Sequence, residues 1–272
     1  MHAALEEKTS DMLKQGMIRL YIFWLYIPLR RLAHACRDSS RRLRAALGLR
    51  PSEASDGGSI LPSLPWKSLC SPSGTTFKEL KKVDGNVNVA ELAVLNALCR
   101  TLKPKSIMEI GTFDGRTTLN LALNSSAQVF TLDLPSNAET VFQVTAADEK
   151  YVKKQFPGAR FSSPPNNSLP CVGRIIQMYG DSGSFDFSPW YGKIDLVFLD
   201  GAHNYEYVVS DTNIALRLLR PEGGIIVWHD YGVWPDVTKA LHELRLKMPW
   251  LPLVHIRDTS LVVSIRNTDD NR

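Results

Sequence analysis

The stretch from Ser106 to Leu119, SIMEIGTFDGRTTL, constrains the fold of this chain more than any other. Its apolar start, Ser106 to Ile110, suits a buried parallel strand, and a helical pattern begins near Thr117. Between them, Gly111 and Gly115 mark backbone that turns sharply or lies against a ligand. A strand, glycine turn and helix place free backbone N–H groups and a positive helix end at the strand's carboxyl tip. The segment therefore predicts a site for a small polar ligand.

The spacing of the glycines in this turn limits the classes of ligand that it could bind. A dinucleotide-binding turn has the pattern G-x-G-x-x-G, in which the second glycine lets a pyrophosphate approach. Here the pattern is E-x-G-x-x-x-G, and Thr112 and Phe113 leave little room for a pyrophosphate. The turn resembles the first motif of class I S-adenosylmethionine-dependent methyltransferases, whose loop wraps the methionine part of the cofactor after an acid, here Glu109. The alternative is a plain strand-to-helix turn without a ligand.

Length and composition indicate one main domain. The chain has 272 residues, of which 44% are hydrophobic and 22% charged, enough for one sizeable α/β domain and an appendage. Residues 51–76 are rich in Ser, Pro and Gly and are predicted to be a linker. The predicted organisation is therefore an N-terminal segment over 1–50, the linker, and the main domain over 77–272.

The positive charge is concentrated in the N-terminal segment. The net charge is +4, but the arginines between Arg30 and Arg50 face a single acid, Asp38, so the remainder is close to neutral. This distribution argues against a nucleic-acid groove across the main domain. The four cysteines form no C-x-x-C pair, which indicates reduced thiols and a cytoplasmic protein.

An apolar run precedes the arginines. Leu20 to Leu29, LYIFWLYIPL, has about ten residues where a membrane span needs about twenty, and no signal-peptide cleavage site follows it. Aromatic residues beside a basic segment fit a helix lying on an anionic membrane, which would place residues 20–50 at the inner membrane face. The alternative is a terminal helix packed on the domain or on a partner subunit.

The rest of the chain alternates strands and helices. The expected strands are 106–110, 128–132, 174–178, 193–199 and 225–228, and the expected helices are 88–102, 117–123, 205–219 and 236–247. The first of these helices begins with Asn88-Val89-Ala90-Glu91, which has the form of a capping box. Residues 138–154 suit a further helix, 156–172 an irregular mobile insertion, and 253–256 with 261–265 a hairpin. This order predicts a Rossmann-like α/β fold: a mostly parallel seven-stranded sheet, helices on both faces, and an antiparallel hairpin at the edge.

Acids follow the second and third strands of this order. Asp133 ends the second strand, where a ribose would be gripped through its two hydroxyls. Asp181 and Ser182 follow the third strand, where they could reach an adenine amino group. The alternatives are structural, because aspartate before Pro135 suits a turn and Asp181 suits a cap.

The motifs together resemble one family more specifically than the turn does. The ordered set EIGTFDG, TLDLP, YGDS, DLVFLDGAHNYE and LLRPEGGIIVWHDY is similar to class I methyltransferases of the macrocin O-methyltransferase-like and cephalosporin hydroxylase-like group, over residues 89–265. The resemblance implies a cofactor site for S-adenosylmethionine made of Glu109, Gly111, Thr112, Gly115, Asp133, Asp181 and Ser182.

Two further acids end the fourth and fifth strands, Asp200 and Asp230. Neighbouring strands lie about 4.8 Å apart, so both carboxylates can converge on one divalent cation, with magnesium preferred. His229 is a candidate third ligand and would favour a transition metal. His203, three residues after Asp200, is a candidate general base with an ordinary pKa near 6.5. The alternatives are two turn-capping aspartates and a helix-start histidine bonded to nearby backbone.

These features predict an S-adenosylmethionine-dependent O-methyltransferase that uses a divalent cation and acts on a small hydroxylated molecule, such as a sugar, glycan or secondary metabolite. One alternative is a non-methyltransferase enzyme of the cephalosporin hydroxylase-like type. The other is a cofactor-binding or membrane-associated assembly protein without turnover. The sequence is compatible with a homo-oligomer, and the substrate pocket is expected from 156–172 and the N-terminal region.

Overall fold

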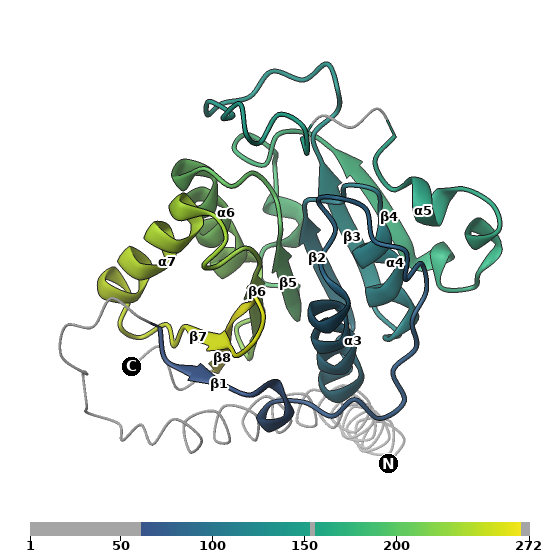
Figure 1. Cartoon of the computed structure of the whole chain (residues 1–272), viewed down its shortest axis with the longest axis horizontal. Helices are drawn as coiled ribbons and strands as arrows, with labels where there is room; N and C mark the ends of the chain where they lie inside the picture. Colours follow the sequence, from purple (N-terminus) through teal and green to yellow (C-terminus); the bar gives the residue numbers. More distant parts are fainter. Residues whose placement is uncertain (1–60, 153–155, 268–272) are drawn as a thin grey trace, which may run out of the picture.

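The computed structural model describes residues 61–152 and 156–267, which form one eight-stranded sheet with helices on both faces (Figure 1). The strand order is β1-β7-β8-β6-β5-β2-β3-β4. The strands are β1 (Ser63–Leu64), β2 (Ser106–Ile110), β3 (Gln128–Asp133), β4 (Ile175–Tyr179), β5 (Leu196–Leu199), β6 (Gly223–Trp228), β7 (Val254–Ile256) and β8 (Val262–Asn267). The helices are α3 (Val89–Leu102), α4 (Arg116–Leu123), α5 (Ala159–Ser162), α6 (Tyr205–Leu218) and α7 (Pro235–Lys247).

The pairing confirms the predicted mostly parallel sheet. Strands β4, β3, β2, β5 and β6 are parallel neighbours in that order, whereas β8 runs antiparallel between β6 and β7. The predicted hairpin is thus present, but it does not form the edge of the sheet. The short strand β1 pairs parallel to β7 outside it and adds an eighth strand to the predicted seven.

Two apolar layers bury both faces of the sheet. On one face, Ile107 of β2 and Phe198 of β5 pack in a cluster with buried residues of α3 and α4. On the other face, Met108 of β2 and Val197 of β5 pack in a cluster with residues of α6 and α7. Successive side chains of a strand point to opposite faces, so strands covered on both sides read as continuous apolar runs. This explains why β2 and β5 were recognisable from sequence.

Helix α3 begins with the predicted capping box. The side chain of Asn88 accepts a hydrogen bond from the Glu91 backbone N–H at 2.9 Å, and the Glu91 carboxylate accepts one from the Asn88 backbone N–H at 2.9 Å. These bonds satisfy two N–H groups that the first helical turn leaves without partners. They also fix Glu91 at the end of the helix that faces the sheet's carboxyl edge.

Two predicted segments differ in the structure. Residues 138–152 form turns rather than a helix, because Phe142 packs on Tyr207 and Asp148 is buried against another loop, and such tertiary contacts override helix propensity. Residues 156–172 are not a plain irregular insertion, because they contain α5, bury Phe161 and Cys171, and lie beside α4 (Figure 1).

The second part of the predicted linker belongs to the domain. Leu61, Leu64, Leu69 and Cys70 are buried, and β1 extends the sheet, because these apolar side chains cover one end of it. Residues 1–60 lie outside the described residues, so the membrane contact predicted for 20–50 stays a prediction. Within the described parts of the chain, no helix is both long and apolar enough to cross a membrane.

The turn after β2 depends on a close approach between backbones. Gly111 has a φ of +100°, and its amide donates to the Leu132 carbonyl at 2.9 Å. The amide of Asp200 donates to the Ile110 carbonyl at 2.9 Å, which draws the end of β5 against the turn. A Cβ atom on Gly111 would lie 2.0 Å from the Asp200 carbonyl oxygen. Glycine is therefore required here by the neighbouring backbone, which agrees with the sharp turn predicted at this position.

We expect Gly111→Ala to lower the free energy of unfolding by at least about 3 kcal/mol, since left-handed strain and a backbone collision act together. Gly192→Ala is the matched control, because Gly192 has a φ of +68° but its nearest heavy atom would be 3.8 Å away. The control should lose only about 1–2 kcal/mol from strain. Urea unfolding of both variants measures the difference, and equal losses would contradict the collision.

Candidate functional site

A pocket of about 300 Å³ lies at the carboxyl ends of the parallel strands. Open α/β sheets bind ligands at this edge. Every parallel strand from β4 to β6 contributes its end to the wall, either directly or through the residues that follow it. These wall residues are Ile110 and Gly111 after β2, Leu132 and Asp133 of β3, Gly180 to Ser182 after β4, Asp200 after β5, and His229 and Asp230 after β6.

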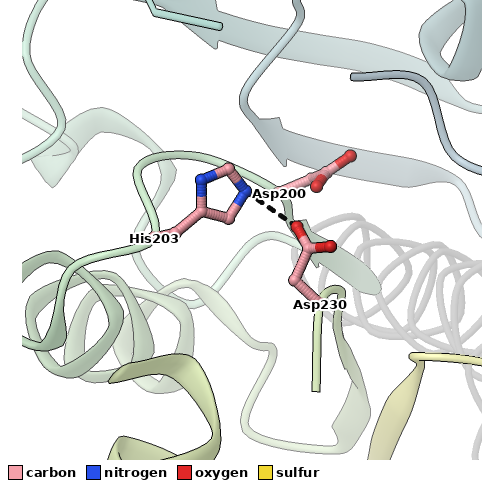
Figure 2. A group of neighbouring side chains, drawn as sticks. All are labelled: Asp200, His203 and Asp230. Atoms are coloured by element: carbon pink, nitrogen blue, oxygen red, sulfur yellow. Dashed lines mark ion pairs between the residues drawn. The ribbon is translucent and has the colours of Figure 1, made fainter. Parts of the chain in front are cut away.

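The side chains of Asp200, His203 and Asp230 lie close together in one part of the pocket lining. Figure 2 shows the His203 ring directed at Asp230, with Asp200 beside them. His203 Nε2 lies 2.7 Å from Asp230 Oδ2, and one ligand atom from each of the three residues falls within 4.8 Å of the others. Two acids from neighbouring strand ends and an imidazole thus form a compact donor set for a cation.

His229 lies among acids and outside this donor set. Its Nδ1 is 2.9 Å from Asp200 Oδ1 and 3.0 Å from Asp230 Oδ2, and its Nε2 is 3.1 Å from Glu91 Oε2. Both nitrogens of His229 thus face carboxylates, as both nitrogens of His203 also do. Among the described residues, the group that could hold a cation contains His203 and not His229.

Glu91 connects this cluster to helix α3 and to the β7–β8 turn. Its Oε1 accepts from the backbone N–H and the hydroxyl of Ser260, both at 2.8 Å, and the Ser260 hydroxyl in turn accepts from the Asp230 backbone N–H at 3.2 Å. From sequence, Glu91 was assigned only a capping role, which it also fills. No local signal could show that the carboxylate also faces His229, 138 positions away.

His203 is held on three sides. Asp148 accepts from its backbone N–H at 3.1 Å and also contacts the ring Nδ1. The Trp234 ring stacks on the imidazole at 4.3 Å between centroids and 6° between planes.

The hydroxyl of Tyr231, the residue after Asp230, lies 2.9 Å from His242 Nε2, and Tyr231 is not part of the donor set.

The cluster gathers an excess of negative charge. It contains four carboxylates and two imidazoles, namely Glu91, Asp148, Asp200 and Asp230 with His203 and His229. Even with both rings protonated, two negative charges remain uncompensated. Buried charges are costly unless paired, so such a group favours protons or a divalent cation.

The pKa values of the imidazoles and carboxylates in this cluster shift because the groups are buried and lie next to one another. Burial disfavours the charged form of His203, but Asp148 and Asp230 outweigh it and raise the ring's pKa to about 9. Burial is likewise outweighed at His229, where Asp200 first and then Asp230 and Glu91 raise the pKa well above its usual value. Burial raises the pKa of Asp200, whereas His203 and His229 hold the pKa of Asp230 below its usual range. His203 is thus protonated near neutrality, unlike the free base expected from sequence.

Four of the predicted cofactor residues line the pocket: Gly111, Asp133, Asp181 and Ser182. Asp133 accepts from the Phe113 N–H at 2.5 Å and the Leu134 N–H at 2.7 Å. Asp181 accepts from the backbone N–H groups of Val141 and Gly183 and from the Tyr207 hydroxyl, at 2.7, 3.0 and 2.7 Å.

The other three predicted cofactor residues, Glu109, Thr112 and Gly115, lie behind the pocket wall. Glu109 is fully buried and accepts from Thr131 at 2.6 Å and from Thr118, and burial raises its pKa to about 8. The Thr112 hydroxyl lies 2.7 Å from that of Thr131. A Cβ on Gly115 would lie 2.6 Å from the Phe161 ring, so this glycine serves packing.

Sequence reasoning also missed part of the pocket rim. Lys82, Asp84 to Asn86, Asn88, Tyr151 and Trp234 line the pocket, whereas residues 156–172, expected to form the substrate wall, are absent from its lining. The aromatic residues of 138–152 were assigned to a helix, so their convergence on the site was hidden. Loop conformation of this kind depends on contacts between distant segments.

Comparison with known proteins gives one family match. Residues 108–231 match the model of a family described as a methyltransferase domain. The match begins in β2 and ends just after Asp230, so it includes the glycine turn and both acids of the cation donor set. No curated protein matches the chain.

Several solved structures are similar to the chain. The SAH-bound methyltransferase PaMTH1 of Podospora anserina has 18% identity and a TM-score of 0.49, covering 68% of this chain and 80% of that one. The O-methyltransferase TomG of Streptomyces achromogenes, in complex with SAM, has 16% identity and a TM-score of 0.47, with 68% and 82% covered. A Bacillus cereus O-methyltransferase in complex with SAH has 16% identity and a TM-score of 0.44, with 68% and 84% covered.

The raised pKa of His203 predicts a pH dependence of stability in the cation-free protein. A folded pKa of about 9 lies above the unfolded value near 6.5, so the contribution is fully present below about pH 6.5 and is lost as pH rises through about 9. The stability difference between the wild type and His203→Gln should therefore shrink over that window. Urea unfolding in EDTA measures it, and a constant difference would contradict the shift.

Proposed function

We propose that the protein is a class I methyltransferase that moves a methyl group from S-adenosylmethionine to a hydroxyl of a small molecule, with help from a divalent cation. The observation that carries the proposal is the shared pocket: Asp133 and Asp181 line one part of it, and Asp200 and Asp230 line another. A donor cofactor and a cation-bound hydroxyl can therefore meet in one cavity.

The chain's residues fit the cofactor. Asp133 lines the pocket at the end of β3, where a carboxylate suits the paired hydroxyls of a ribose. Ser182 lies at the next strand end, beside the fixed carboxylate of Asp181, and would be a partner for the adenine. The turn at Gly111, which lines the same pocket as Asp200, would hold the methionine part of the cofactor.

The donor set also fits a divalent cation. Two carboxylates and an imidazole within 4.8 Å suit magnesium less than manganese or another transition metal, because magnesium prefers oxygen ligands. The sequence-based preference for magnesium thus rests on the two acids alone. Asp200 and Asp230 would hold the ion, and His203 would complete the set through Nε2 once it has lost its proton.

The residues around the ion then have separate tasks. A bound divalent cation lowers the pKa of a hydroxyl and stabilises the alkoxide. Asp200 and Asp230 fix the acceptor oxygen near the methyl donor, which favours transfer by proximity. His229, held by Glu91, keeps the two acids together by countering their repulsion. Trp234 and Tyr151 shield this end of the pocket from water.

Two other functions stay open as alternatives. A non-methyltransferase enzyme of the cephalosporin hydroxylase-like type would use the same cation set with another co-substrate. An assembly protein without turnover would bind the cofactor but has no need for paired acids beside it. The acceptor as sugar, glycan or secondary metabolite, homo-oligomer formation and a cytoplasmic or membrane-peripheral location are further parts of the proposal.

Cofactor binding is tested by calorimetry with S-adenosylhomocysteine. We expect wild-type protein to bind it, and Asp133→Asn to weaken binding about tenfold, because an amide nitrogen would oppose either the Phe113 or the Leu134 N–H and disturb the ribose site. Asp186→Asn is the control, since Asp186 is exposed and absent from the pocket lining. Binding of NAD with no heat from S-adenosylhomocysteine would refute the assignment.

Cation use is tested with the full chain after EDTA treatment. We expect Mn²⁺ to bind with one site per chain and Asp230→Asn to lose at least tenfold in affinity, since one carboxylate ligand becomes a neutral amide. Methyl transfer to pooled cell metabolites, followed with labelled S-adenosylmethionine, should fall with EDTA and return with Mn²⁺. Transfer that is indifferent to EDTA and to Asp230→Asn would remove the cation from the proposal.

A further inference from the structure

The segment Thr145–Val152 brings an acid, Asp148, into the site, although the segment is not one of the strand ends. Its turns are closed by backbone bonds from Asp148 N–H to the Thr145 carbonyl at 2.9 Å and from Tyr151 N–H to the Asp148 carbonyl at 2.8 Å. Asp148 is thus at the corner of two turns, and its side chain is fully buried although most neighbouring residues are exposed. Such burial of an acid needs partners.

Both partners of Asp148 are on His203. One carboxylate oxygen accepts from the His203 backbone N–H at 3.1 Å, and the other contacts the ring Nδ1. A carboxylate at Nδ1 keeps a proton on that nitrogen, which leaves Nε2 as the nitrogen that faces Asp230 at 2.7 Å. The stacked Trp234 ring fixes the plane of the imidazole. Asp148 thus selects which nitrogen and which ring orientation the cation donor set receives.

The far end of the same segment is tied to the pocket rim. Asp84 lies 3.1 Å from Lys150 Nζ and 3.2 Å from the Tyr151 hydroxyl. The side chains of Asp84 and Lys150 are 78% and 60% exposed, so water screens this ion pair and it contributes little. Closer packing occurs at Gly85, which has a φ of +93° and where a Cβ would lie 2.8 Å from Tyr151 Cδ1. Packing of Gly85 on the Tyr151 ring therefore holds the segment more than charge does.

We propose that Asp148 is the positioning residue of His203, and that packing of Tyr151 on Gly85 at the pocket rim keeps Asp148 in place. The proposal rests on the proposed function, because it gives His203 Nε2 its use as a cation ligand. A carboxylate that orients a ligating imidazole typically changes metal affinity 10- to 100-fold when it is removed. Asp148 itself does not line the pocket, so it acts only through His203.

The first measurement needs neither cation nor turnover. In proton NMR of the full chain, the His203 Nδ1–H should appear as a downfield, slowly exchanging signal, identified by its loss in His203→Gln. Asp148→Asn should remove or strongly shift this signal, because an amide cannot hold the ring proton as a carboxylate does. Glu149→Gln is the matched control on the same segment, since Glu149 is exposed, and it should leave the signal unchanged.

The second measurement follows Mn²⁺ and S-adenosylhomocysteine by calorimetry. Asp148→Asn should bind Mn²⁺ about 10- to 100-fold more weakly and S-adenosylhomocysteine with unchanged affinity. Gly85→Ala, which changes the pocket rim but no carboxylate or imidazole of the cluster, should speed exchange of the His203 ring proton, whereas Gly192→Ala should not. The Gly85→Ala variant provides an independent test of the proposal if Asp148→Asn does not fold.

The proposal is overturned if the ring signal is the same in Asp148→Asn and wild type, or if wild-type Mn²⁺ affinity survives that change. If Asp148→Asn does not fold, the proposal is overturned when the His203 ring proton exchanges at the same rate in Gly85→Ala and Gly192→Ala. If wild-type protein binds no Mn²⁺, the cation part of the proposed function fails, and the ring signal alone decides whether Asp148 positions His203.

Discussion

The structure of the site depends on the burial of carboxylates that exceed their counter-charges. Asp200 and Asp230 end adjacent strands, and their closeness would be unfavourable without His229 between them and His203 beside them. Three of the resulting shifts favour added positive charge, because the pKa values of His203 and His229 rise and that of Asp200 rises with burial, whereas the pKa of Asp230 falls. The carboxyl edge of the sheet therefore carries a cluster of buried charges that depend on one another.

Distant segments supply the groups that make this burial tolerable. Glu91 comes from the start of α3, Ser260 from the β7–β8 turn and Asp148 from the loop after β3, and each bonds to a residue of the cluster. The β7–β8 turn is thus more than an extension of the sheet, because Ser260 receives the Asp230 backbone N–H. We expect a change in any of these segments to alter the positions of the side chains of Asp200, His203 and Asp230.

Sequence predicted the sheet well because its signals are local. The apolar run of β2, the capping box of α3 and the acids after β5 and β6 are each visible within a few residues, and parallel strands bring their ends to one edge. The same reasoning assigned a helix to 138–154, of which residues 138–152 form turns, and a substrate wall to 156–172, which is absent from the lining of the pocket. Loop shape follows packing on other segments, as Phe142 on Tyr207 and Phe161 on the Gly115 turn show.

The sequence by itself determined the order of strands and helices, the glycine turn and the acids Asp133, Asp181, Asp200 and Asp230 at the strand ends. Those follow from periodicity and from the geometry of parallel sheets. Tertiary structure decided which of these side chains face the pocket, that both His203 and His229 contact the acids at the strand ends, and that Gly111 is needed against the Asp200 backbone. Side-chain direction and charge pairing arise from contacts between residues far apart in the chain, which no local pattern encodes.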